Sequence, residues 1–158
     1  SIQSQIIELY PLLEDIIDEI LPKKQMIIAR CQDHIQLVCV NQEILFFNQR
    51  DGPFFPTLRL LHQYPNIMHR MQVDKGAIRF VIGGANVMCP GFTSPGGSLP
   101  EQLGVDVPVA IYVEGKEHAL AIGLTKMSTS DIVTINKGIA VENIHYLLDG
   151  LWQHPSIN

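Results

Sequence analysis

The stretch VDKGAIRFVIGGANVMCPG, residues 73–91, contains the strongest structural signals in this sequence. Asp74 is a favourable N-cap residue, and the apolar residues after it recur at spacings of three and four, which predicts a helix. The apolar stripe of this helix consists of Ala77, Ile78, Val81 and Ile82. The helix is expected to end at Gly83-Gly84, because glycine adopts a positive φ at little cost. An apolar strand over residues 86–89 should follow and break at Pro90-Gly91.

The other face of the predicted helix carries positive charge. Lys75 and Arg79 are four residues apart, so both side chains project from the same face. The loop that follows has almost no side chains, which lets a bulky polyanion approach the backbone closely. This pattern predicts an RNA site. The candidate contacts are Lys75, Arg79, Gly83, Gly84, Ala85, Met88, Pro90 and Gly91.

The composition indicates a folded protein outside the membrane. The chain has 158 residues, of which 46% are hydrophobic, so it could form one ordinary domain or two small ones with a buried core. No apolar run approaches the ~20 residues that a membrane span needs, and nothing points to secretion. We therefore expect a cytoplasmic protein without a membrane partner.

The charge is unevenly distributed along the chain. The formal net charge is −5, and the first 22 residues contain five of the sixteen acids and neither Lys nor Arg. Between Arg50 and Arg79, in contrast, five basic residues face only Asp51 and Asp74. Phosphates could therefore bind a locally basic surface, but the net negative charge argues against tight, sequence-independent binding to long nucleic acid.

The three cysteines, Cys31, Cys39 and Cys89, lie in or next to apolar runs. This placement predicts buried, reduced thiols in a cytosolic protein. The alternative is a metal site built from Cys31, His34 and Cys39. A fourth ligand is not apparent, so we expect neither a metal nor another cofactor.

The N-terminal part of the chain predicts a helix and a small antiparallel sheet. Residues 3–20 form an acidic amphipathic pattern with a break near Pro11. Three short apolar runs follow, over residues 26–31, 35–40 and 43–47, and turn residues separate them, which predicts a meander. A short helix over residues 57–64 comes next.

Phe54 and Phe55 lie in an irregular stretch before that short helix. Pro56 is expected to stop any strand there. The two rings are expected to fill the seam between two domains, since large apolar side chains need a surface to pack on. The alternative is an exposed aromatic platform for a partner protein or an RNA base.

A domain boundary is expected near residues 66–72, which divides the chain into residues 1–69 and 70–158. After residues 73–91 we expect a loop over 92–106 and strands over 108–113 and 118–127. A helix should then begin at the N-cap Ser128 and run to Asn136, and Gly138 should end it. A closing strand is expected over 139–147. The fold class expected for the whole chain is α+β.

Two segments resemble the signature of the PUA domain, a small RNA-binding β-barrel. The first contains Asp74-x-Gly76-Ala77, Gly84-Ala85 and the closing Met88-x-Pro90-Gly91. The second, KGIAVENIHYL at residues 137–147, is similar to the last strand of that fold. This resemblance implies a C-terminal PUA β-barrel.

A narrower resemblance covers residues 5–153. LFFNQRDGPFFPTLRLLHQYP at residues 45–65 and NKGIAVENIHYLLDGLW at residues 136–152 resemble the malignant T-cell-amplified sequence 1 family. This resemblance implies an N-terminal α/β domain with a small antiparallel sheet before the PUA barrel. It also implies a translation factor that acts with density-regulated protein on the small ribosomal subunit, in initiation, reinitiation and removal of deacylated tRNA during recycling. Its RNA would be tRNA or small-subunit rRNA. Phe54 and Phe55 are the candidate contacts to the protein partner.

The sequence shows no catalytic centre. None of the six histidines stands at a recognisable spacing from a nucleophile, and the glycines lack the Gly-Lys-Ser/Thr ending of a phosphate loop. His145, in the closing strand, is expected to be packed and hydrogen-bonded rather than a base. We therefore expect a non-enzyme. The alternative function is an RNA-guiding PUA subunit of an RNA-modification enzyme whose catalytic chain is separate, although the N-terminal stretch favours the translation family.

Overall fold

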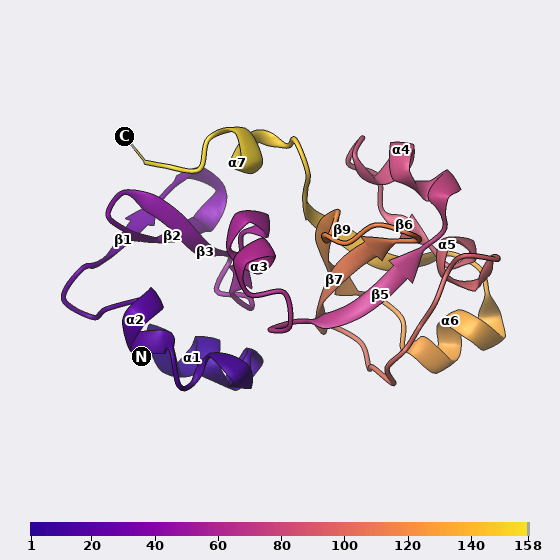
Figure 1. The fold of residues 1–158 in the computed structure, drawn as a ribbon, viewed down its shortest axis with the longest axis horizontal. Coiled ribbons are helices and arrows are strands. Elements are labelled where there is room, and N and C mark those ends of the chain that lie inside the picture. The colour runs from indigo at the N-terminus through magenta and orange to yellow at the C-terminus, as the bar shows by residue number, and fades with distance from the viewer. Residues whose placement is uncertain (158) are drawn as a thin grey trace.

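The computed structural model of the protein describes residues 1–157 and contains two sheets. The first is a four-stranded sheet with the strand order β1-β2-β3-β4, and the second is a five-stranded sheet with the order β5-β7-β8-β9-β6. Helices pack around both sheets (Figure 1). This mixture confirms the predicted α+β class, with a small antiparallel sheet in the N-terminal part.

The N-terminal helical region consists of three short pieces rather than one broken helix. They are α1 (Ile2–Leu9), the 3-10 turn η1 (Pro11–Leu13) and α2 (Ile17–Ile20). Tyr10 leaves the helical region at φ −130° and ψ 74°, because it precedes Pro11, whose ring excludes a helical conformation there. The predicted break near Pro11 is therefore confirmed, and a second break precedes α2.

The predicted meander is confirmed. β1 (Met26–Arg30), β2 (Ile35–Val40) and β3 (Glu43–Gln49) are antiparallel neighbours, with Ile28 opposite Val38 and Val38 opposite Phe46. A short strand β4 (Phe55–Pro56) pairs with β3. β4 ends at Pro56, as expected, but the proline itself belongs to the strand, because an edge strand tolerates proline. The helix α3 (Leu58–Gln63) then begins at its N-cap Thr57.

The second sheet contains the predicted strands and one that the sequence did not reveal. β7 (Pro108–Val113), β8 (Ala121–Thr125) and β9 (Ile139–Tyr146) are antiparallel neighbours, and β6 (Val87–Met88) pairs with β9. The strand that was not predicted is β5 (His69–Val73), which pairs in parallel with β7. Strand β5 therefore follows directly from the N-terminal part.

The helices of the second part start largely where the sequence predicts. Asp74 caps the 3-10 turn η3 (Lys75–Ala77), which continues into α4 (Ile78–Val81). Ser128 caps α6 (Thr129–Ile135), but Asn136 at φ 52° ends this helix, rather than Gly138. Pro90 begins the short helix α5 (Pro90–Thr93) instead of only breaking a strand, because the first turn of a helix accepts proline.

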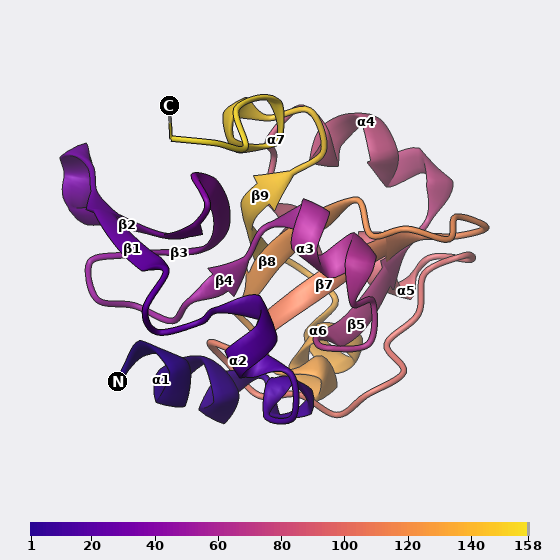
Figure 2. The ribbon, with the colours of Figure 1, turned by 60° about the vertical axis from the view of Figure 1, so that its left-hand side comes forward.

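The C-terminal end of the chain returns to the first sheet. After α7 (Gly150–Gln153), the backbone N–H of Ile44 donates to the oxygen of Pro155 at 2.8 Å, and that of Ile157 donates to the oxygen of Gln42 at 2.9 Å. Figures 1 and 2 show this segment crossing from β9 to the first sheet. The chain therefore begins and ends on the same part of the molecule.

One hydrophobic core joins the two parts. Phe54, Phe55 and Leu58 pack in the same cluster as Ala110 and Tyr112 of β7. Phe54 and Phe55 are only 2% and 5% exposed, and the Tyr10 hydroxyl donates to the oxygen of Phe54 at 2.6 Å. The expectation that these rings fill the seam is confirmed, and the alternative of an exposed aromatic platform is wrong.

The cysteines divide into two kinds. Cys39 and Cys89 are buried, as predicted, but Cys31 is exposed because it directly follows the end of β1, next to the 3-10 turn η2 (Gln32–His34). Residues 1–157 contain no group of three or more His, Cys, Asp or Glu side chains placed to hold a metal ion. Across the same residues, every helix is too short or too polar to cross a membrane.

Candidate nucleic-acid interface

A hollow of about 560 Å³ opens beside the segment that carries the strongest sequence signals. Its walls come from η3 and α4, the loop after α4, strand β6, helix α5 and the start of β9. The lining residues are Asp74, Gly76, Ala77, Phe80, Val81, Ala85, Asn86, Val87, Met88, Pro90, Gly91, Ser94 and Ile139. The hollow is therefore built almost entirely from one continuous stretch of chain.

Large apolar side chains lie exposed around this hollow. Phe80 is 54% exposed, Met88 is 48% exposed and Ile139 is 43% exposed. Isolated exposed apolar residues are common, but several around one concavity typically mark a binding site. The hollow thus offers apolar contact area, including one aromatic ring, to a flat ligand.

Asp74 lines the hollow and joins the two ends of the stretch that builds it. Its carboxylate accepts a hydrogen bond from the backbone N–H of Ala77 at 3.0 Å, which caps the helical segment. Its own N–H donates to the oxygen of Gly91 at 3.1 Å. Asp74 therefore ties the beginning of the stretch to its end.

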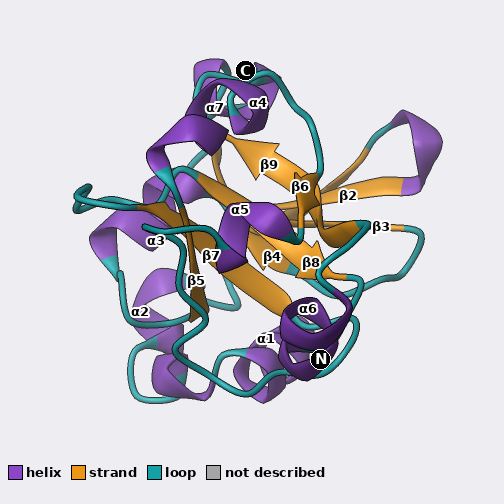
Figure 3. Cartoon of the chain, turned by 90° about the vertical axis from the view of Figure 1, so that its right-hand side faces the viewer, coloured by secondary structure: helices purple, strands orange, loops and turns teal. Residues whose placement is uncertain are grey.

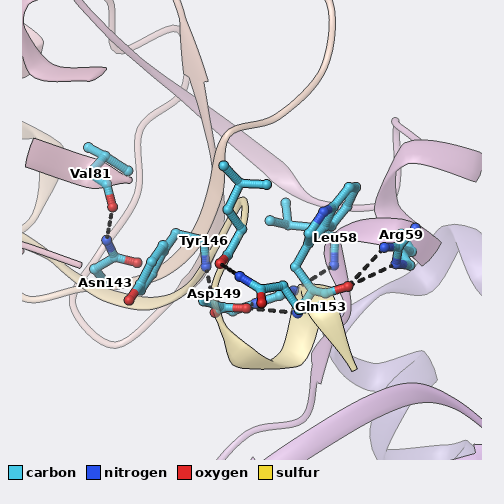
Figure 4. A network of polar contacts seen from close by, with 10 residues as sticks. Leu58, Arg59, Val81, Asn143, Tyr146, Asp149 and Gln153 are labelled. Carbon is cyan, nitrogen blue, oxygen red and sulfur yellow. Dashed lines mark hydrogen bonds and ion pairs between the residues drawn. The ribbon is translucent and has the colours of Figure 1, made fainter. Parts of the chain in front are cut away.

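Asn143 of β9 holds the loop between α4 and β6. Its side-chain amide donates to the oxygen of Val81 at 3.0 Å and to that of Ala85 at 3.1 Å. Its backbone N–H donates to the side-chain oxygen of Asn86 at 3.0 Å. Figure 4 shows the bond to Val81. A single asparagine therefore fixes both ends of this loop.

Gly84 is required where the loop turns. Its φ is +89°, a conformation that residues with a Cβ atom rarely adopt. A Cβ atom at this position would also lie 3.1 Å from the hydroxyl oxygen of Tyr146. The predicted need for a small residue with positive φ is thus met at Gly84, and Tyr146 is the neighbour that limits the space.

Two cations flank the hollow without lining it. Lys75 and Arg79 are exposed, and neither forms an ion pair within residues 1–157. The Arg79 guanidinium lies 4.8 Å from the centre of the Phe80 ring. The side chain of Lys75 extends toward the turn at Gly115, between β7 and β8. Positive charge therefore lies next to the apolar mouth in the chain, and no acid of residues 1–157 pairs with it.

The predicted site residues divide into two groups. Ala85, Met88, Pro90 and Gly91 line the hollow, whereas Lys75, Arg79, Gly83 and Gly84 lie outside its lining. Sequence reasoning missed Phe80 and Ile139. Phe80 had a usable signal, because it falls off the apolar stripe of the predicted helix and beside Arg79. Asn143 had none, since its role depends on contacts with a distant loop.

A buried polar junction connects strand β9 to the N-terminal part (Figure 4). His145 is 1% exposed, and its Nε2 accepts a hydrogen bond from the backbone N–H of Leu58 at 3.1 Å. Nε2 therefore carries no hydrogen, and Nδ1 donates to Asp149 at 2.7 Å. The prediction of a packed, hydrogen-bonded histidine is confirmed.

Asp149 organises the start of α7 as well as the imidazole ring. It accepts from the backbone N–H groups of Tyr146 at 3.0 Å and Trp152 at 2.8 Å. Burial favours a raised pKa for this carboxyl, but the bond from His145 and the two N–H groups outweigh burial and lower its pKa. Asp149 is thus held ionised.

The helix α7 is anchored to α3 by Arg59. The Arg59 guanidinium donates two hydrogen bonds to the backbone oxygen of Trp152, at 2.8 and 3.3 Å. It also lies 4.0 Å from the centre of the Trp152 ring. His62 packs edge-on to the Trp152 ring. Burial lowers the pKa of His62, although the hydrogen bond to the oxygen of Ala119 acts to raise that pKa. The C-terminal segment is therefore part of the seam.

Comparison with known protein families assigns the class. The Pre-PUA-like domain family matches residues 1–65, and the PUA domain family matches residues 69–147. The candidate hollow lies wholly within the second match. The chain is therefore an RNA-binding PUA protein, as the signature at Asp74–Gly91 indicated.

The chain belongs to the malignant T-cell-amplified sequence 1 family. It is 54% identical over 158 residues to the malignant T-cell-amplified sequence 1 homolog of Dictyostelium discoideum, a match that covers 99% of this chain and 87% of the relative. It is 57% identical over 153 residues to malignant T-cell-amplified sequence 1 of Rattus norvegicus, covering 96% of this chain and 84% of the relative.

Solved structures of archaeal proteins share the fold. A hypothetical protein from Pyrococcus horikoshii superimposes with a TM-score of 0.70 and 23% identity, over 98% of this chain and 96% of that one. A conserved PUA domain protein from Thermoplasma acidophilum gives a TM-score of 0.64 and 19% identity, over 81% of this chain and 80% of that one. These matches confirm the predicted pairing of an N-terminal α/β domain with a PUA domain.

Proposed function

We propose that the protein is a non-catalytic translation factor of the cytoplasm that binds RNA. In this proposal it acts with a density-regulated-protein-like partner on the small ribosomal subunit, in initiation, reinitiation and removal of deacylated tRNA during recycling. The observation that carries the RNA part is the apolar hollow on the PUA domain, bordered by the unpaired cations Lys75 and Arg79.

The arrangement suits single-stranded RNA. An unstacked base presents a flat face that can pack against Phe80, Met88 or Ile139, and such stacking tolerates any base. In this proposal Lys75 and Arg79 contact the phosphates of the same strand, and cations contribute sequence-independent affinity. The unpaired 3′ end of a deacylated tRNA, or an unpaired loop of small-subunit rRNA, has this chemistry.

The chemistry of the hollow supports binding rather than catalysis. Among its lining residues, Asp74 is the only one with a titratable side chain, and its carboxylate caps the helical segment. His145 faces Leu58 and Asp149 in the buried seam and is not available to a ligand in the hollow. These placements favour a protein that positions RNA.

Fluorescence anisotropy with labelled deacylated tRNA tests the RNA part. Intact tRNA should bind more tightly than the same tRNA without its unpaired 3′ end. The double variant Phe80→Ala, Met88→Ala should bind intact tRNA about tenfold more weakly, because base stacking contributes about 1–3 kcal/mol. Leu12→Ala is the control, since Leu12 is exposed and far from the hollow in the chain. If the double variant binds both intact tRNA and an rRNA loop as tightly as the wild-type protein does, the hollow is excluded as the RNA site.

Sedimentation with small ribosomal subunits tests the translation part. The chain and density-regulated protein together should sediment with the subunits, and addition of both should release deacylated tRNA from them. Co-purification with a modification enzyme, and not with small-subunit proteins, would instead support the alternative of an RNA-guiding subunit.

A further inference from the structure

Strand β1 leaves one edge of the first sheet open. The backbone N–H of Cys31 donates to the oxygen of Ile35 at 2.8 Å, which fixes the alternation of the β1–β2 ladder. The N–H and C=O groups of Met26, Ile28 and Arg30 therefore point away from β2. Over the part of the chain that the structure describes, no other strand pairs with β1.

The same sheet is completed elsewhere by an extended segment of this chain. Residues 155–157 run beside the start of β3 and exchange backbone hydrogen bonds with residues 42–44. Among the described residues β1 has no such cover, and the interior of the strand lacks two usual protections of an edge. Its interior contains neither a proline nor a charge, and Ile27 is 52% exposed. An open, apolar edge is a template for one more strand.

Cations flank this edge, and none of them forms an ion pair with a described residue. Lys23 and Lys24 precede β1 and Arg30 ends it, and no acid occurs between residues 20 and 32. The hairpin β1–β2 projects from the body of the molecule (Figure 3). Its outer end carries a hollow of about 620 Å³ lined by Arg30, Cys31, Asp33, His34, Ile35, Gln36, Arg50 and Asp51. Within residues 1–157, neither arginine forms an ion pair.

We propose that the open edge of β1 binds an extended, acidic segment of a partner protein as an added antiparallel strand. The outward groups of Met26, Ile28 and Arg30 would pair with its backbone, and Ile27 would meet an apolar side chain. Its carboxylates would meet the cations at both ends of the strand, namely Lys23, Lys24, Arg30 and Arg50. This inference rests on the proposed partnership with a second protein.

The same features argue against other occupants. A second copy in antiparallel pairing would place its Arg30 opposite Lys24, so that like charges meet at both ends of the paired strands. RNA has cation-binding phosphates but no ladder of amides that matches the outward backbone groups. A protein segment with acidic flanks satisfies both the backbone and the charges.

Hydrogen exchange resolved by residue tests the proposal directly. The probe is a synthetic peptide of alternating valine and threonine with glutamates at both ends. In the free protein the amides of Ile28 and Arg30 should exchange fast, while those of Ile27 and Ala29 are already protected by β2. Saturating peptide should slow exchange at Ile28 and Arg30 at least tenfold and leave Ile27 and Ala29 unchanged. A merely nearby ligand would not produce this alternation.

Matched peptides and variants separate the backbone from the charges. A peptide with lysines in place of the glutamates, and one interrupted by prolines, should fail to protect these amides. The double variant Lys24→Glu, Arg30→Glu should bind the acidic peptide at least tenfold more weakly. Lys116→Glu with Lys137→Glu makes the same charge change elsewhere, at two exposed residues, and should bind normally. Neither double variant replaces a buried residue, so both should fold.

Two outcomes would overturn the proposal. One is unchanged exchange at Ile28 and Arg30 with the acidic peptide at about a millimolar, the weakest affinity worth calling a site. The other is protection that grows with protein concentration alone, which would assign the edge to a second copy. Repeating the exchange with density-regulated protein separates the inference from the proposed function. If that protein binds without protecting these amides, the inference fails and the partnership stands. If the peptide protects these amides but density-regulated protein does not bind, the partnership fails and the inference about the edge of β1 stands.

Discussion

The Nε2 atom of His145 accepts a hydrogen bond from the backbone N–H of Leu58, 87 residues earlier in the chain, at 3.1 Å. Leu58 begins α3, where backbone N–H groups have no partner within the helix. Strand β9 of the PUA domain thus supplies an acceptor for a helix of the N-terminal part. Because Asp149 accepts from the other ring nitrogen, the tautomer is fixed, and the seam depends on a neutral imidazole.

Replacement of His145 should therefore destabilise the whole protein. In His145→Ala the N–H of Leu58 and the carboxylate of Asp149 lose a buried partner, and a cavity remains. We expect the free energy of unfolding to fall by about 2–4 kcal/mol. Urea unfolding followed by circular dichroism measures this loss. His154→Ala is the control, because His154 is exposed. A loss no greater than that of the control would contradict the role of the junction.

Asp149 should make stability depend on acid pH. Its pKa is lower in the folded protein than in the unfolded chain, so its contribution is complete above the ordinary carboxyl value. The contribution disappears as pH falls through the lower folded value. Asp149→Asn should cost about 2 kcal/mol near neutral pH, and the difference from wild type should shrink below about pH 4. Urea titrations across this range measure it, with Asp15→Asn as an exposed control. A difference that stays constant to the lowest pH would show that the charge is irrelevant.

Asn143 should position the loop that borders the RNA hollow. Asn143→Ala removes both donors to Val81 and Ala85, and Asn143→Asp places a carboxylate against the same two oxygens. We expect tRNA affinity to fall about tenfold, which corresponds to 1.4 kcal/mol, and the aspartate to be worse. The slope of affinity against salt should stay unchanged, because the phosphate contacts remain. Normal affinity in a folded Asn143→Asp protein would exclude this positioning role.

Lys75 and Arg79 should contact phosphates. The double variant Lys75→Glu, Arg79→Glu should weaken binding to tRNA or rRNA. The slope of log affinity against log salt concentration should become shallower by about the contribution of two phosphate contacts. Binding measured at two salt concentrations gives the slope. Lys23→Glu with Lys24→Glu makes the same change in charge away from the hollow and should leave RNA binding unchanged. An unchanged slope in the first variant would show that these cations are only solvated surface charges.

Gly84 should not tolerate a side chain. Gly84→Val forces a β-branched residue to a positive φ and against Tyr146, which should cost at least ~1 kcal/mol of stability and disturb the RNA hollow. Thermal unfolding and tRNA binding measure the two effects. Gly104→Ala is the control, because its Cβ atom would meet open space. A Gly84→Val protein with normal stability and normal RNA binding would contradict both expectations.

The sequence by itself determined the local elements and the family. The spacing of apolar residues predicted β2 and β7 with their observed bounds, and the side chains of Asp74 and Ser128 marked where helical segments begin. These features depend on neighbours within a few residues, and such short-range geometry is written directly in the order of side chains. The motif of residues 73–91 also identified the PUA domain.

Only the tertiary structure decided which distant groups meet. The parallel pairing of β5 with β7, the return of residues 155–157 to β3, and the bond between Leu58 and His145 leave no periodic signal in the chain. The role of Asn143 follows from the same cause, because its partners Val81 and Ala85 lie in a distant loop. A hydrogen bond between remote residues forms because folding brings a buried donor to an acceptor, and that match depends on packing across the whole core rather than on local pattern.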